Sequence, residues 1–197
     1  MSRRPLAVAL VHYPIVDRRG DLVTTAVTNL DIHDIARTCR TFGVERYFVI
    51  TPAAEQQTLL ERLLAHWRTG HGAGYNPDRA EALSLVTVTA TLEEALASWR
   101  EELGEAPLPV LTSARAGGIS FPRCRQLATE RPLLLVFGTG WGLAPALFER
   151  GWPVLEPIAG TDGYNHLPVR AAVAIILDRL QRQGQDQLSA AVASDLG

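Results

Sequence analysis

Two apolar runs, each followed by a loop that contains glycine, decide the predicted fold of this chain. The first is Leu133-Leu134-Leu135-Val136-Phe137, which continues directly into Gly138-Thr139-Gly140-Trp141-Gly142. The second is Val154-Leu155-Glu156-Pro157-Ile158, which precedes a polar loop over residues 159–167. A short apolar run next to glycine is typical of a strand that is buried on both faces, as the strands of parallel sheets are. We therefore expect two such strands here, and after them a helix that ends near Leu180.

The two loops are expected to form one ligand pocket. Ligands of open α/β sheets bind outside the carboxyl ends of the strands. Glycine lets backbone N–H and C=O groups approach a ligand without a Cβ in the way. The alternative is that the glycines only form a tight turn.

Strand and helix patterns alternate along the rest of the chain. Strands are expected over residues 6–11, 44–50, 85–88 and 110–113, and helices over about 29–42, 54–67, 77–84, 91–103 and 122–129. With the two apolar runs this gives about six strands, which predicts an α/β fold with a mostly parallel sheet flanked by helices. Residues 1–180 are expected to form a single domain. We expect a flexible loop at residues 70–75, and a tail at residues 181–197 that is partly disordered or a loose helix.

The composition limits the possible functions. With 47% hydrophobic and 20% charged residues, the chain resembles a soluble globular protein, and its apolar runs are shorter than the roughly 20 residues that cross a membrane. The net charge of −2 excludes a strong overall field for nucleic acid, so RNA would need a local patch. All 19 basic residues are arginine, a residue suited to phosphate. Two cysteines and five histidines show no metal-ligand spacing, and a cytoplasmic location is expected.

Two clusters of polar residues are candidate functional groups. Asp31, His33, Asp34 and Arg37 share the start of one predicted helix, where carboxylates are also favoured by the helix dipole alone. The second cluster lies in and beside the expected flexible loop: Trp67, Arg68, His71, Tyr75 and Asn76. It could be a surface that stacks on nucleobases, or Trp67 could simply be packed beside a mobile loop.

A nicotinamide-dependent oxidoreductase is an enzyme alternative. Its glycine motif differs, because the third glycine would fall one residue after Gly142. Glu156 does lie near the distance at which a ribose-binding carboxylate would be expected.

Three stretches in order resemble the motifs of the SPOUT superfamily of RNA methyltransferases. The similarity is greatest to a bacterial branch found alone or fused behind a tRNA guanine-N1 methyltransferase domain. It covers about residues 6–180, and its motifs are residues 27–44, residues 135–143, and residues 155–160 with 164–172. The chain departs from the ribose-methylating members, which have Asn at the position of Asp31 and Gly at that of His33. Arg37 matches their motif arginine.

The resemblance implies a C-terminal trefoil knot, bound S-adenosylmethionine, a homodimer and an RNA substrate, with neither a metal nor a membrane. By position, the cofactor-binding residues would be Thr112, Gly138, Thr139, Gly140, Gly142, Ile158, Gly160, Asn165, His166 and Leu167. Arg37 would orient the nucleophile or accept its proton, with Asp31 and Asp34 supporting it. The expected RNA contacts are His12, Tyr13, Asn29, His33, Trp67, Tyr75 and Asn76. A non-catalytic module that dimerises or binds RNA is the alternative from another class.

Overall fold

The computed structural model describes residues 3–115, 117–162 and 164–181. Five parallel strands form the main sheet in the order β5-β4-β1-β7-β6. Their bounds are Val86–Thr89, Arg46–Ile50, Leu6–Val11, Leu133–Gly138 and Leu108–Leu111. β1 is the central strand and all six of its residues are buried. The predicted parallel α/β architecture is confirmed.

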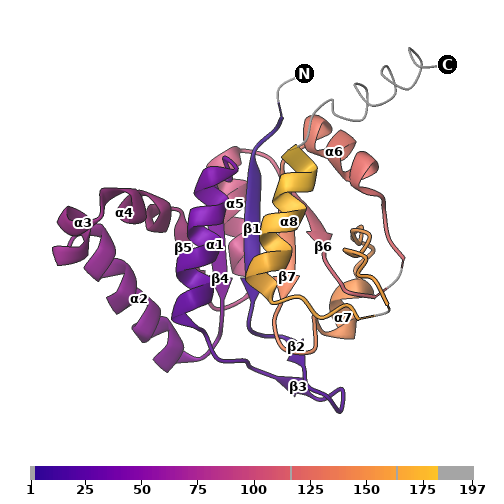
Figure 1. The fold of residues 1–197 in the computed structure, drawn as a ribbon, viewed down its shortest axis with the longest axis horizontal. Helices are drawn as coiled ribbons and strands as arrows, with labels where there is room; N and C mark the ends of the chain where they lie inside the picture. The colour runs from indigo at the N-terminus through magenta and orange to yellow at the C-terminus, as the bar shows by residue number, and fades with distance from the viewer. Residues whose placement is uncertain (1–2, 116, 163, 182–197) are drawn as a thin grey trace.

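Helices cover both faces of the sheet, because alternate residues of each strand point to opposite faces. On one face, Val8 and Leu10 pack with Ile32 and Ile35 of α1 and with Val173 of α8. Figure 1 shows α1 and α8 side by side over β1 on this face, and α5 behind the sheet. The core on the opposite face of the sheet contains Ala7 and Ala9 of β1 and Trp99 of α5. The helices are α1 (Asn29–Thr41), α2 (Ala54–Arg68), α3 (His71–Tyr75), α4 (Pro77–Ser84), α5 (Leu92–Leu103), α6 (Phe121–Glu130), α7 (Pro145–Phe148) and α8 (Val169–Gln181).

The expected sixth strand at residues 154–158 is wrong. Only isolated bridges form there, from Leu111 to Val154 and from Ile119 to Leu155. Proline at positions 153 and 157 lacks the N–H that a strand ladder requires, so the pairing cannot extend. We call residues 153–156 the crossing segment, because they are hydrogen-bonded on two sides. Leu155 N donates to Leu111 O at 2.8 Å, and Ile119 N donates to Val154 O at 2.7 Å.

One further local prediction is corrected, and one element was not predicted. Residues 71–75 form the short helix α3 rather than a flexible loop, and a Cβ on Gly72 would lie 2.7 Å from the Trp67 ring, so this turn is packed on the indole. Sequence patterns also missed the antiparallel hairpin of β2 (Ile15–Val16) and β3 (Leu22–Val23), whose strands are too short to show a period. Of the expected tail, residues 182–197 lie outside the described residues.

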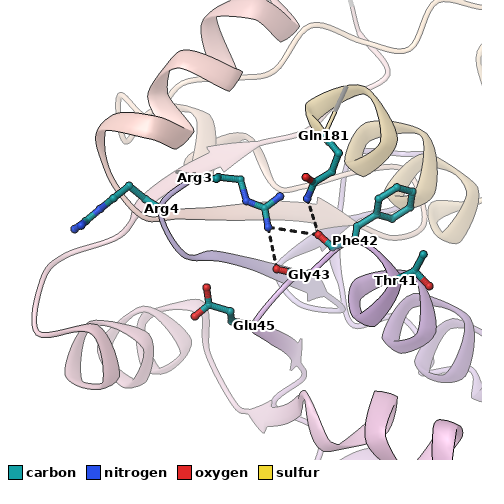
Figure 2. A pocket seen from close by; sticks show the side chains of 7 residues that line it. All are labelled: Arg3, Arg4, Thr41, Phe42, Gly43, Glu45 and Gln181. Carbon is teal, nitrogen blue, oxygen red and sulfur yellow. Dashed lines mark hydrogen bonds between the residues drawn. The ribbon is translucent and has the colours of Figure 1, made fainter. Parts of the chain in front are cut away.

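The C-terminus of α1 is held by residues from both ends of the described chain (Figure 2). Arg3 Nη2 donates to the carbonyl of Gly43 at 2.8 Å, and Gln181 Nε2 donates to that of Phe42 at 2.5 Å. These donors satisfy carbonyls that a helix end leaves without intrahelical partners. They border a cavity of about 530 Å³ at the amino end of the sheet.

Candidate functional site

Three loops meet where β6 and β7 end. They are residues 112–114 after β6, the glycine-rich loop after β7, and the second loop, and residues 112–114 contact the other two. The Thr112 backbone N–H and hydroxyl both donate to Val136 O at 3.0 Å, two residues before the glycine-rich loop of residues 138–142. On the other side, Asn165 Nδ2 donates to Ala114 O at 2.9 Å. Thr112, the glycine-rich loop and Asn165 were all predicted to line one pocket. The structure brings them to the same edge of the sheet.

The glycines of the first loop differ in their surroundings. A Cβ on Gly138 would lie 2.8 Å from the backbone N of Leu143, and one on Gly140 would press on the methyl groups of Ile15 and Thr25 at 3.2 Å. These two positions are therefore required by the protein's own packing. Gly142 has φ of +109° and open space where a Cβ would lie. Gly142 is consequently the glycine of this loop that is free to approach a ligand.

Thr139 points toward β1 rather than toward the second loop. Its hydroxyl donates to Val11 O at 3.1 Å and contacts the hydroxyl of Thr25. Thr25 Oγ1 also lies 3.0 Å from Nδ1 of His12. The Thr139 side chain therefore holds the glycine-rich loop against β1 and Thr25.

His12 follows the last residue of β1 and is fully buried. Burial lowers the pKa of its imidazole to about 4, and the nearby charge of Asp31 only partly opposes this. Its Nε2 has no hydrogen-bond partner among the described residues. The imidazole is thus neutral near pH 7 and has no exposed surface, whereas its predicted companion Tyr13 is 38% exposed.

The second loop, residues 158–167, offers unused backbone donors. Among its described residues, 158–162 and 164–167, no backbone N–H group donates to another described residue. A Cβ on Gly160 would lie 2.2 Å from Tyr164 O, so this glycine closes a tight turn. The His166 ring packs edge-on against Tyr164 at 5.3 Å, and Leu167 is 44% exposed. Ile158 packs on the core. Free amides beside glycines are the groups that adenine and a carboxylate could use.

The acidic residues of α1 pair with Arg170 and not with Arg37. Arg170 Nη1 lies 3.2 Å from Asp31 Oδ1, and Arg170 Nε lies 3.6 Å from Asp34 Oδ2. Asp31 also accepts from the hydroxyl of Thr28, the N-cap of α1, at 2.6 Å. The Arg37 side chain is exposed and makes no hydrogen bond or ion pair with another described residue. Sequence reasoning missed the role of Arg170, because it contacts α1 across 139 positions of sequence.

A second group of predicted residues surrounds Trp67. His33 meets its ring edge-on at 5.4 Å, and the guanidinium of Arg79 lies 4.9 Å from the ring centroid. With Gly72 also packed against it, the indole is a structural centre rather than a free stacking surface. Beside it, Asn29 lines a groove of about 460 Å³ between α1 and α2.

Tyr75 and Asn76 lie far from the glycine-rich loop. Tyr75 is 80% exposed and stacks on His71, while the Asn76 side chain accepts from the backbone N of Arg79 and caps α4. In Figure 1, α3 and α4 lie at the left edge, and the end of β7 and α7 lie toward the lower right. The structure does not bring these two residues to the predicted cofactor site.

Other site types find no support in the structure. The carboxylate of Glu156 accepts from the backbone N of Phe121 at 2.6 Å at the start of α6, so it is engaged and not directed at a ribose. In the described residues, no group of three or more His, Cys, Asp or Glu side chains could hold a metal ion. Within the same residues, no helix has the length and apolarity to cross a membrane.

The fold places the chain among proteins of known structure. The parallel five-stranded sheet flanked by helices matches the fold of solved SpoU and TrmH methyltransferases. The SpoU methyltransferase AviRb from Streptomyces viridochromogenes, solved in complex with AdoMet, matches with a TM-score of 0.55 at 19% identity over 93% of this chain and 59% of that one. The TrmH/SpoU tRNA modifying enzyme of A. aeolicus matches with a TM-score of 0.55 at 18% identity over 94% and 78%.

The family follows from sequence. Residues 5–182 match the family model described as SAM-dependent RNA methyltransferase, and the chain belongs to this family. The resemblance inferred from three motifs is therefore confirmed.

Two sequence relatives cover most of this chain, and one of them is much longer than it. A tRNA (guanine-N(1)-)-methyltransferase of Oleidesulfovibrio alaskensis is 48% identical over 178 residues, which cover 90% of this chain but 42% of that protein. The chain thus spans less than half the length of this relative. An uncharacterized protein of Aquifex aeolicus is 40% identical over 184 residues, covering 91% of this chain and 90% of that protein.

Proposed function

We propose that the protein transfers a methyl group from S-adenosylmethionine to RNA. The observation that carries this proposal is the meeting of the glycine-rich loop and the second loop through residues 112–114, in a chain of the SAM-dependent RNA methyltransferase family. Bound S-adenosylmethionine would supply an electrophilic methyl group. The protein's task is then to hold the nucleophile in line and to exclude water.

The predicted cofactor residues fit such a ligand. Gly142 leaves open space, and the backbone N–H groups of residues 158–162 and 164–167 donate to no other described residue. Thr112, Ile158 and Asn165 would form the walls between them. Thr139 and Gly140 would act indirectly, because their contacts fix the loop against β1 and the segment before α1.

Arg37 is the residue proposed to act on the acceptor. An RNA nucleophile, either a ribose hydroxyl or a ring nitrogen, must lose a proton, which would pass to solvent, and an exposed guanidinium can orient the nucleophile and stabilise its negative charge. Asp31 and Asp34 would contribute by fixing Arg170, and through it the start of α8, rather than by holding Arg37. Three residues remain proposed RNA contacts: Asn29 and His33 of α1, and Tyr13.

The trefoil knot is part of the proposal. The crossing segment has Leu111 on one side and Ile119 on the other, and a Cβ on Gly118 would lie 2.4 Å from Val154 O. These contacts support a chain that passes through the loop between β6 and α6 before it reaches α8. A homodimer is proposed on family grounds; light scattering of the purified protein would test it.

The acceptor is proposed to be tRNA in the cytoplasm. The curated tRNA methyltransferases extend well beyond the region shared with this chain, so their named guanine-N1 activity can reside in the remaining part. Guanine N1 is therefore one candidate atom among several. Mass spectrometry of nucleosides from deletion and parent strains would identify the modified base.

Calorimetry with S-adenosylmethionine and transfer of labelled methyl to RNA from a deletion strain test the proposal. We expect binding and transfer by the parent protein, and Arg37→Ala should abolish transfer while cofactor affinity stays nearly unchanged. Unchanged turnover would remove Arg37 from the mechanism. If the parent binds RNA but neither binds S-adenosylmethionine nor transfers methyl, the protein is the non-catalytic RNA-binding module instead.

A further inference from the structure

The β2–β3 hairpin, residues 15–23, extends from the edge of the sheet that carries the predicted site (Figure 1). Its turn is held by Asp17, whose Oδ1 accepts from the backbone N of Arg19 at 2.7 Å and of Asp21 at 3.0 Å. No ion pair joins Asp17 to Arg18 or Arg19 in the described structure. Both arginines are exposed, and their side chains make no hydrogen bond or ion pair with another described residue.

Arg18 and Arg19 share this lack of an ion pair with Arg37, Arg62 and Arg100 in the described residues, whereas some other surface arginines have partners. Several of them pair with a glutamate: Arg4, Arg40, Arg46, Arg123 and Arg150. A paired guanidinium has its charge partly neutralised, whereas an unpaired one is available to a phosphate. The chain as a whole has a charge of −2, so any attraction of RNA must come from such a local group.

The hairpin is joined directly to the glycine-rich loop. Val16 N donates to Gly142 O at 3.0 Å, and Trp141 N donates to Val16 O at 3.3 Å. Ile15 forms an antiparallel bridge with Leu143. Trp141 is thereby placed next to the strand that leads into the two arginines. Its indole is 58% exposed, a large apolar surface beside the predicted methyl-transfer site.

We propose that the β2–β3 hairpin and Trp141 form a contact surface for the substrate RNA, with Arg18 and Arg19 on phosphates and Trp141 stacked on an unpaired base. The inference deepens the proposed function and rests on it. Unpaired guanidinium groups beside an exposed aromatic ring are the combination that single-stranded RNA segments bind. The turn also carries the carboxylates of Asp17 and Asp21, so the proposed phosphate contacts rest on the two unpaired, exposed guanidinium groups and not on a net positive charge of the turn.

The test is binding of bulk tRNA from a deletion strain to the full chain across a range of salt concentrations. Arg18→Ala/Arg19→Ala should weaken binding about tenfold or more at low salt and make the salt dependence less steep by about one ion per lost phosphate contact. The matched control is Arg100→Ala/Arg131→Ala, which removes two exposed arginines at the opposite end of the sheet and should leave binding unchanged.

Trp141→Ala should weaken tRNA binding at least about fivefold, and Trp141→Phe should restore most of it, because a ring that can stack is kept. Affinity for S-adenosylmethionine should be unchanged in the hairpin double variant, which separates RNA docking from the cofactor site.

Parent-like affinity and salt dependence in the hairpin variants would overturn the inference. It would also be overturned if these variants changed only the oligomeric state measured by light scattering, since the surface would then join two copies of the chain. Loss of tRNA binding in the variants of a parent that does not methylate would support the hairpin as an RNA contact and refute the proposed methyl transfer.

Discussion

The buried His12 should make stability fall as the solution becomes acidic. Its pKa is lowered from 6.5 to about 4 in the folded protein, chiefly by burial, so between these values the unfolded chain binds a proton that the native state does not. Stability therefore rises with pH through this window and is lost as pH falls. At about 1.4 kcal/mol per pKa unit, the full loss below pH 4 is about 3 kcal/mol, of which about 2 kcal/mol has occurred by pH 5.

His12→Gln removes this titration. The variant should lose about 1 kcal/mol at pH 7.5 because the contact with Thr25 is changed, and it should then lose about 2 kcal/mol less than the parent between pH 7.5 and 5. Urea unfolding followed by tryptophan fluorescence measures both values. His71→Gln, which removes an exposed histidine, should reproduce the parent profile. An unchanged pH slope in His12→Gln, or an imidazole NMR titration of His12 near 6.5, would refute this account of the buried ring.

The remaining predictions concern single contacts. Gly142→Ala should lower the affinity for S-adenosylmethionine more than tenfold by calorimetry. The control Gly104→Ala, also at positive φ with open space around its Cβ, should share only the backbone strain of about 1–2 kcal/mol. Equal cofactor affinities of the two variants would contradict the pocket assignment. Gly118→Ala should lower the free energy of unfolding in urea by about 3 kcal/mol or more, because its Cβ would lie 2.4 Å from Val154 O. Gly117→Ala should cost far less, since its Cβ meets open space. Similar losses of stability in the two variants would contradict the close contact between Gly118 and the crossing segment. Arg170 is 38% exposed, so Arg170→Ala should cost at most about 1 kcal/mol, with stronger double-mutant coupling to Asp31, 10% exposed, than to Asp34, 45% exposed; the reverse order would argue against the ion-pair geometry.

Local signals in the sequence predicted the elements that depend on local interactions. Thr91 accepts from the backbone N of Glu94, and Asn76 from that of Arg79, as capping patterns indicate. The parallel sheet followed from apolar runs that are buried on both faces. The same reasoning made residues 154–158 a strand, although the two prolines restrict them to isolated bridges.

Features that depend on distant residues could not be predicted in this way. Residues 70–75 contain three glycines, a composition typical of a flexible loop, yet packing of Gly72 on Trp67 stabilises a helix there. Arg170 is one arginine among many until the fold places it against α1. In the candidate site, motif resemblance located the loops, but only the structure distinguishes Gly142, which faces open space, from Gly138 and Gly140, which pack against the protein itself.

The contacts with Phe42 and Gly43 bring Arg3 and Gln181 to one spot (Figure 2). This spot lies at the amino end of the strands, whereas the glycine-rich loop follows the carboxyl end of β7. A surface tether attached at residue 3 or residue 181 would therefore hold the protein by the end of the sheet opposite the proposed RNA-facing edge. Immobilising the protein from that side should leave access for a large polyanion unobstructed.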